Sequence, residues 1–382
     1  MQYFDPHSNN WLLNKFETYK ELRAMDKAYW SEKYGMYIIT RYADVKYALG
    51  ANDIFSSAKG NLIVEHPFRF GRTLGASDEP DHSIYKNIVK NAYSKDNIQR
   101  IADCFTSKAT LLLNGKESLN ISNVIEELSA WTTAEILNLP YDKEEIKNIV
   151  LGIQRHSPLA VSENIDPTCA NQFKNIINDL AFVNKTAPTG PGIYKEFMEH
   201  EPEKLKLVSL FQGPTISGAS SLTGALEFLT LDLFRENQLD TLIADRTLIP
   251  AAVEESLRFH ASTGRFSRTV TTEVTLHGID LKPGDRVALC LESANRDPAM
   301  FVEPEKFILN RNTVGQLAFG HGIHACIALA ISKTMMVKYL EILLDLVGKY
   351  RVTTPHDELK YVMTSSGNDD MISNIHIEKD FT

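Results

Sequence analysis

One short stretch, residues 317–328, constrains the fold of this chain most. It reads Leu-Ala-Phe-Gly-His-Gly-Ile-His-Ala-Cys-Ile-Ala, and a long apolar helix is predicted to begin near Ile327. Glycine lets the backbone adopt turns that residues with a Cβ resist. Cys326 would then lie where the free N–H groups and positive dipole end of the helix favour an anion. This placement is expected to lower the thiol pKa and favour the thiolate that ligates metal, with Phe319 shielding the sulfur from water.

Two simpler interpretations of the cysteine compete with a metal-bound thiolate. A lone cysteine at a helix start is commonly a small buried apolar side chain. Alternatively, His321, His324 and Cys326 could form a zinc site, but zinc normally takes a fourth ligand, and none is nearby in the sequence.

The spacing Phe-x-x-Gly-x-His-x-Cys, filled by Phe319, Gly322, His324 and Cys326, resembles the heme-binding loop of the cytochrome P-450 family. In that family a cysteine thiolate is the axial ligand of the iron. The resemblance implies that Cys326 is the metal ligand and that Phe319 and His324 contact heme b. Ala328 stands where the family usually has glycine two residues after the cysteine.

A second resemblance lies in residues 78–86. His82 and Lys86 are four apart and therefore share one face of a predicted helix, where they could hold a carboxylate or simply form a solvated surface. The segment resembles the family's Asp-x-Pro-x-His-x-x-x-Arg motif, whose His and Arg bind heme propionates. Lys86 replaces the Arg, which keeps the charge and loses the bidentate fork.

A long apolar helix is predicted over residues 204–234, with a kink at Pro214. By position it resembles the family's central helix, which crosses the heme with an Ala-Gly-x-acid-Thr motif. Ser220, or Ser221 if one gap is allowed, stands in place of the threonine, and no acid adjoins either serine in the sequence. The resemblance implies a catalytic role in proton delivery, whereas hydrogen bonding back to the helix carbonyls would assist the kink.

Two further features come from the following segments. Glu255 and Arg258 are three apart on a predicted helix, and most such pairs are weak surface ion pairs. They resemble the family's Glu-x-x-Arg motif, which is a buried structural network supporting the cysteine loop. Arg268 corresponds to a propionate-binding arginine of the family, the alternative being a charge on an edge strand.

The remaining pattern predicts helices over residues 11–30, 44–49 and 98–140, a strand over 36–42 and short strands after residue 264 and near the C-terminus. The irregular loop 60–77 carries Phe68 and Phe70, which could face a ligand or anchor the loop. In the family, residues like those between 155 and 205 cover the substrate pocket, and this region is short here.

Composition narrows the function classes. The chain has 382 residues, with 43% apolar and 23% charged residues, which is ordinary for a globular protein. A net charge of −9 without a Lys/Arg cluster argues against nucleic acid as a partner. No signal sequence and no run of 18 apolar residues is found, so no membrane partner is expected. The four cysteines are widely spaced, which favours a cytoplasmic location.

Together the resemblances imply a bacterial-type cytochrome P-450 over residues 1–382 as one domain. The expected fold is mainly α with small β-sheets, a triangular prism with heme between the central helix and the cysteine-loop helix. The implied function is a monooxygenase that hydroxylates or epoxidises a small organic molecule, free or on a carrier protein, in secondary metabolism. Electrons would come from NAD(P)H through a ferredoxin and ferredoxin reductase. The alternatives are an atypical enzyme using peroxide or substrate-assisted proton delivery, and a non-catalytic heme-binding protein.

Overall fold

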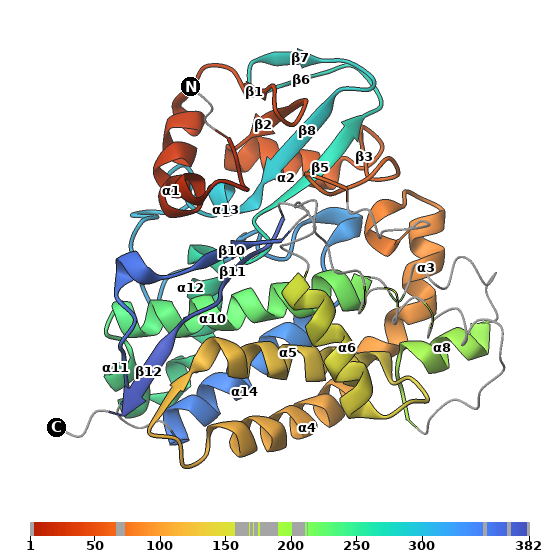
Figure 1. Ribbon diagram of the computed structural model, residues 1–382. Helices are drawn as coiled ribbons and strands as arrows, with labels where there is room; N and C mark the ends of the chain where they lie inside the picture. Colours follow the sequence, from red (N-terminus) through yellow and green to blue (C-terminus); the bar gives the residue numbers. More distant parts are fainter. Residues whose placement is uncertain are drawn as a thin grey trace.

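The computed structural model describes residues 4–65, 73–156, 190–200, 213–346, 350–364 and 368–379, together with the single positions 168, 171, 175 and 211. Figure 1 shows most helices gathered in one part of the molecule, and the largest sheet in another, flanked by helices α1 and α2. The predicted fold class, mainly α with small β-sheets, is confirmed. Within the described residues, no helix has the length and apolar character that crossing a bilayer requires.

The largest sheet has five strands in the order β1-β2-β8-β5-β3. Strands β2 and β8 are parallel, and every other neighbouring pair is antiparallel. In spatial order the strands are β1 (Tyr29–Ser31), β2 (Met36–Ile39), β8 (Arg286–Cys290), β5 (Arg265–Val270) and β3 (Phe55–Ser56).

Two helices cover opposite faces of this sheet because successive strand residues point to opposite sides. Helix α1 (Asn9–Ala24) belongs to a buried cluster with Ile38 and Ala288, which are paired across β2 and β8. Helix α2 (Tyr42–Gly50) belongs to a second cluster with Ile39 and Leu289. Helix α2 ends against the cysteine loop, so this sheet positions one wall of the site.

The helical part holds the largest buried apolar cluster, to which α4, α5, α10, α12 and α14 all contribute. Figure 1 shows α10 running through the middle of this part, close to α5. The helices are α3 (Asp81–Val89), α4 (Lys95–Leu113), α5 (Ile121–Leu137), α6 (Lys143–His156), α8 (Ile193–His200), α10 (Ala219–Arg235), α11 (Leu239–Ala244), α12 (Ile249–Phe259), α13 (Leu291–Ala294) and α14 (Leu329–Leu346).

Short helical turns join these elements. In the described part of the chain, the 3₁₀ turns are η1 (Leu74–Ala76), η2 (Lys90–Tyr93), η5 (Arg246–Leu248), η6 (Gly322–His324) and η7 (His356–Glu358). Another turn, η4 (Gly213–Gly218), is π-helical and leads directly into α10. Pro214 lies in it, and a proline removes one helix hydrogen bond. The kink predicted at Pro214 falls on this turn, and residues 204–210 and 212 of the predicted helix lie outside the described residues.

Three small antiparallel sheets complete the fold. They contain β4 (Ser118–Asn120), β12 (His376–Lys379) and β9 (Tyr350–Val352); β10 (Tyr361–Met363) and β11 (Asp370–Ile372); and β6 (Val274–Leu276) and β7 (Ile279–Leu281). Strand β11 lies on α10 at Gly224, where an added Cβ would come within 2.2 Å of the Asp370 carbonyl oxygen. This close approach brings the C-terminal segment to the central helix.

The predicted helix over 98–140 is wrong as one element. Helix α4 ends at Leu113, Gly115 has φ +71°, and β4 follows. The Asn120 side chain then caps α5 by accepting a hydrogen bond from the Ser122 N–H at 3.0 Å. The residues before and after β4 both favour helix, so the sequence pattern did not indicate the interruption. The interruption is needed because β4 pairs with β12.

Other boundaries shift by a few residues. The first helix ends at Ala24 rather than residue 30 because Tyr29–Ser31 pairs with β2. Strand β2 ends at Ile39, and the helix after Cys326 begins at Leu329. Phe68, Phe70 and most of the region between 155 and 205 lie outside the described residues.

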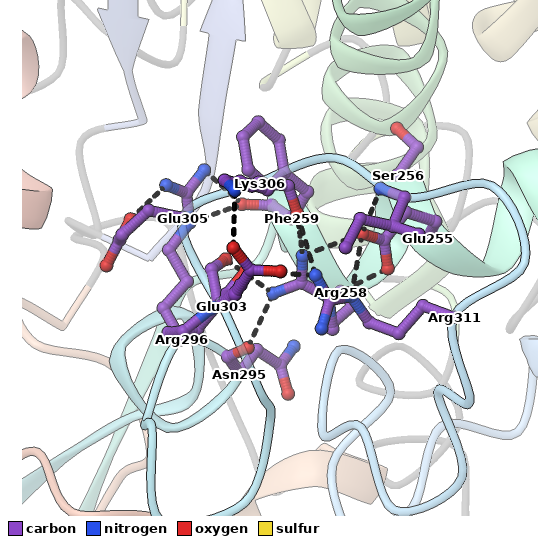
Figure 2. Close-up of polar contacts among 12 residues, drawn as sticks. Glu255, Ser256, Arg258, Phe259, Asn295, Arg296, Glu303, Glu305, Lys306 and Arg311 are labelled. Carbon is purple, nitrogen blue, oxygen red and sulfur yellow. Dashed lines mark hydrogen bonds and ion pairs between the residues drawn. The ribbon is translucent and has the colours of Figure 1, made fainter.

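The Glu255–Arg258 pair of α12 is fully buried, as predicted. Its two hydrogen bonds join Arg258 Nε and Nη2 to the Glu255 carboxylate, each at 2.8 Å. Figure 2 shows the same guanidinium reaching the Asn295 backbone, and its Nη1 donates to the Asn295 carbonyl oxygen at 3.0 Å. The Asn295 side-chain oxygen in turn accepts from the Leu317 N–H at 2.6 Å. The pair thus supports the start of the cysteine loop.

The carboxylate of Glu255 also serves the segment before that loop. Its Oε1 accepts a hydrogen bond from the Ile308 N–H at 2.8 Å. The same oxygen accepts from Arg311 Nε at 3.0 Å (Figure 2). Arg258 donates further to the carbonyl oxygens of Pro304 and Lys306 at 2.9 and 3.1 Å. One ion pair therefore holds several turns of irregular backbone between α13 and the cysteine loop.

We expect Glu255→Ala to destabilise the protein strongly, because it leaves two buried guanidinium groups without their carboxylate. Breaking a buried pair in this way costs about 3–5 kcal/mol. Urea unfolding followed by circular dichroism measures the change. Glu17→Gln removes an ion pair of the same spacing at the surface and is the control, expected to cost less than about 1 kcal/mol. Equal effects of the two substitutions would contradict the structural role.

Candidate functional site

A cavity of about 310 Å³ lies between the cysteine loop, α3, β5 and α10. Its walls are largely apolar, which suits a flat organic group. Seven of the residues singled out in the sequence line it: His82, Lys86, Ser221, Arg268, Phe319, His324 and Cys326. Glu255 and Arg258 are not among the described residues that line it.

The cysteine loop has the backbone that its glycines predict. Gly320 and Gly322 have φ of +70° and +75°, in the left-handed region that favours glycine. A Cβ on Gly322 would come within 2.7 Å of the Leu49 carbonyl oxygen, so α2 packs directly on the loop. The Cys326 N–H donates to the Phe319 carbonyl oxygen at 2.9 Å. These contacts fix the sulfur at the cavity wall.

The thiol of Cys326 lies just before α14 and faces the cavity. The residue is exposed to the open cavity, but desolvation by the surrounding protein raises the thiol pKa, although the N–H groups of Ala328 and Leu329 lower it. The prediction that the thiol pKa is lowered overall is therefore wrong for the protein without a bound group. The predicted contribution is nevertheless present, because N–H groups at the start of the helix do lower that pKa. Because desolvation disfavours the bare thiolate, a bound cation is what would stabilise this sulfur as an anion.

Four groups that can carry positive charge gather at another part of the cavity: His82 and Lys86 of α3, Arg268 of β5 and His324 of the loop. We call this set the cationic cluster. The rings of His82 and His324 meet edge to face, with centroids 4.5 Å apart. Lys86 Nζ donates to the Ile323 carbonyl oxygen at 3.3 Å, which ties α3 to the loop. The predicted propionate-binding residues are thus brought together.

Electrostatics show that the cationic cluster is short of negative charge. Burial, with repulsion from Arg268, His82 and Lys86, lowers the pKa of His324 to about 3. Burial also lowers the pKa of Arg268 to about 10, partly offset by Asp78. The buried Nε2 of His324 has no hydrogen-bond partner among the described residues. An anion bound here would supply that partner and raise the histidine pKa.

These features fit heme. Its two propionates match the anion that the cationic cluster requires, its macrocycle matches the apolar walls, and the Cys326 sulfur at the same cavity suits iron. A zinc site fits poorly, because no group of three or more His, Cys, Asp or Glu side chains in the described residues could hold a metal.

The two candidate serines of α10 differ in position. Ser221 lines the cavity, and its hydroxyl lies 3.4 Å from the Gly218 carbonyl oxygen. Ser220 is buried, does not line the cavity, and has its hydroxyl 3.4 Å from the Ser217 carbonyl oxygen. Both serine hydroxyls therefore lie near helix carbonyl oxygens of the adjoining π-helical turn η4. Hydrogen bonding to these carbonyls is the alternative to a catalytic role.

The structure adds a cavity residue that the sequence reasoning missed. Asp369, in the segment between β10 and β11, lines the cavity and accepts a hydrogen bond from the Ser220 hydroxyl at 3.2 Å. An acid does stand beside a candidate serine, but it comes from 149 residues downstream. Burial raises the pKa of Asp369 to about 6, while hydrogen bonds from Thr263 and Ser220 lower it. No local motif around Asp369 indicates this position.

Comparison with known proteins agrees with the site. The family model described as Cytochrome P450 matches residues 234–367, which include Glu255, Arg258, Arg268 and Cys326. The chain is 24% identical over 377 residues to pulcherriminic acid synthase of Bacillus subtilis (strain 168), covering 91% of this chain and 92% of that protein. It is 26% identical over 356 residues to erythromycin C-12 hydroxylase of Saccharopolyspora erythraea, covering 87% of each.

Solved structures share the fold. P450BioI, determined in complex with an acyl carrier protein ligated to hexadec-9Z-enoic acid, matches with a TM-score of 0.83 at 18% identity. The match covers 97% of this chain and all of that one. The family model, the curated relatives, the shared fold and the cysteine loop together support a bacterial-type cytochrome P450.

Proposed function

We propose that this protein is a heme-thiolate monooxygenase that oxidises a C–H or C=C bond of a small organic molecule. The observation that carries the proposal is the meeting of the Cys326 thiol, the cationic cluster and the central helix α10 at one cavity. Heme b bound by a thiolate supplies dioxygen activation and oxygen transfer, because the thiolate pushes electron density toward the iron.

The chain's own residues divide the remaining work. Cys326 supplies the sulfur ligand, and the cationic cluster holds two carboxylates by charge-assisted hydrogen bonds. Phe319 shields the sulfur from water and gives its carbonyl oxygen to the Cys326 N–H. The Glu255–Arg258 pair keeps the loop in place through Asn295 and Leu317.

Electrons for this reaction come from NAD(P)H through redox proteins, as in the family. We propose a ferredoxin and its reductase, because the sequence carries no flavin or iron–sulfur motif of its own. Substrate delivery on a carrier protein, a role in secondary metabolism and a cytoplasmic location stay predictions. The carrier-bound complex of P450BioI and the names of the two curated relatives support the first two.

The hydroxyls of α10 have separable roles in this proposal. Ser221 faces the cavity and can hold a proton for the reacting group, whereas Ser220 holds the Asp369 carboxylate in position. If neither serine takes part, substrate hydroxyls or waters deliver the protons, or hydrogen peroxide supplies the oxygen directly; the sequence leaves both alternatives open. Ser221 is the better candidate for contact with substrate because Ser221 lines the cavity and Ser220 does not.

Cys326→Ser is expected to abolish the red-shifted Soret band of the reduced carbonyl complex, because a hydroxyl does not replace the thiolate at iron. Absorption spectra of purified, heme-loaded protein measure this. Cys104→Ser changes another free cysteine, outside the cavity, and should keep the band. A Cys326→Ser protein that keeps the band would refute the assignment of the ligand.

Arg268→Gln is expected to speed heme loss about 10- to 150-fold, since a hydrogen bond to a charged group contributes about 1.5–3 kcal/mol. Transfer of heme to excess apomyoglobin, followed at the Soret band, gives the rate. Arg351→Gln, on the exposed edge of β9, is the matched control and should behave as the unchanged protein. Identical rates for both variants would remove Arg268 from the propionate site.

Ser221→Ala is expected to lower the fraction of consumed electrons that appear in product by about 10-fold or more, because a positioned proton donor contributes about 10²–10⁴-fold. NADPH consumption and product are measured together, with a ferredoxin and reductase. Ser220→Ala is measured in parallel and should have a smaller effect. Unchanged coupling in the Ser220→Ala, Ser221→Ala double variant would show that both hydroxyls are bystanders and favour the peroxide or substrate-assisted route.

A further inference from the structure

The cavity has a second group of polar residues in its lining, and this group contains a carboxylate instead of cations. Among the described residues that line it, the only carboxylate is that of Asp369. It comes with small polar neighbours, Ser262, Thr263 and Asn368, while the rest of the nearby wall includes Leu222 and other apolar side chains of α10. A mostly apolar pocket with a few fixed polar groups is how proteins orient small ligands.

The main chain fixes Asp369 firmly. It forms an antiparallel β-bridge with Thr263. Its N–H donates to the Thr364 hydroxyl at 3.2 Å, and its carbonyl oxygen accepts from the Thr364 N–H at 3.0 Å. The carboxylate is held as well, because Oδ1 accepts from the Thr263 hydroxyl at 2.6 Å and Oδ2 from the Ser220 hydroxyl at 3.2 Å. The group is therefore preorganised rather than free to turn away from a ligand.

The charge of Asp369 is not paired within the described residues. The nearby guanidinium of Arg265 bonds instead to Asp370, at 3.0 and 3.1 Å, and to Glu292, at 2.7 Å. A carboxylate offers about four lone-pair sites, and the two hydroxyls occupy two of them. A buried carboxylate with spare acceptor sites is costly until a donor satisfies it.

We infer that the substrate carries an N–H group, of an amide or an amine, which donates a hydrogen bond to the Asp369 carboxylate. This inference rests on the proposed function, since it assigns the substrate class of the same cavity. The Asp369 carboxylate repels an anionic group of a substrate, such as a free carboxylate. The N–H group of the substrate lies at Asp369, and its apolar part lies against the apolar walls. The orientation sets which bond of the substrate is presented for oxidation.

The expected signature is a preference for ligands that differ only in the N–H. A hydrogen bond to a charged group corresponds to about 10- to 150-fold in affinity. Pairs of secondary amides and their N-methylated tertiary counterparts, such as N-benzylacetamide and N-benzyl-N-methylacetamide, provide the comparison. A parallel pair of a primary amine and the hydrocarbon that carries a methyl group in place of the amino group separates charged amines from neutral amides as the preferred donor.

The experiment measures the dissociation constants of both members of each pair by equilibrium dialysis with the heme-loaded protein. The unchanged protein should prefer the N–H member about 10-fold or more. Asp369→Leu, which buries no polar group, and Asp369→Asn should reduce that preference to about 3-fold or less. Asp357→Asn, an exposed carboxylate outside the cavity, is the matched control and should retain the preference.

Two results would overturn the inference. One is an unchanged protein that binds both members of each pair equally. The other is a preference that survives in both Asp369 variants, even where the fraction of electrons that reach product falls, because the carboxylate would then serve turnover and not recognition. The reduced carbonyl spectrum of each protein is recorded alongside. A missing thiolate band would refute the proposed function, whereas an intact band with no N–H preference refutes only this inference.

Discussion

The buried ion pair of Glu255 and Arg258 is the interaction on which the rest of the site depends. It joins α12 to the Asn295 backbone, and the Asn295 side chain carries that support to the first residue of the cysteine loop, Leu317. On its other side the loop rests against the end of α2 at Gly322. A sulfur that must meet a metal in one position needs this kind of support, because a loop alone would not hold it within a fraction of an ångström.

The cavity is organised by charge as much as by shape. Its cationic cluster carries unsatisfied donor capacity, shown by the unpartnered Nε2 of His324 and by the pKa of that histidine, which burial and neighbouring cations lower to about 3. Desolvation by the surrounding protein raises the pKa of the Cys326 thiol, so the thiolate too requires a counter-charge. An iron porphyrin supplies both counter-charges: its anionic propionates match the cationic cluster, and its metal cation matches the Cys326 thiolate. The two ends of the site therefore depend on the same group.

Much of this site could be predicted from the sequence because its parts are local motifs. The loop around Cys326, the α3 segment with His82 and Lys86, and the Glu255–Arg258 spacing each carry their chemistry within about ten residues. The fold class followed from the same resemblance. That the chain forms one domain stays a prediction, as do the individual roles of the site residues. The net pKa of Cys326 was mispredicted because desolvation is a tertiary effect that no spacing reveals.

Asp369 shows where sequence reasoning stops. Its neighbours in space, Ser220 and Thr263, are 149 and 106 positions away along the chain. The packing of β11 on α10 at Gly224 and the β-bridge between Asp369 and Thr263 bring them together. The strand β4 was missed for a similar reason, because its partner β12 lies at the opposite end of the chain. Contacts between distant segments carry no local signal.

The most direct test of the account is X-ray absorption at the iron edge of the purified protein, compared with its Cys326→Ser variant. The account predicts one sulfur scatterer in the first coordination shell of iron, lost in the variant. A first shell made of nitrogen and oxygen alone in the unchanged protein would contradict the central claim that Cys326 binds heme iron.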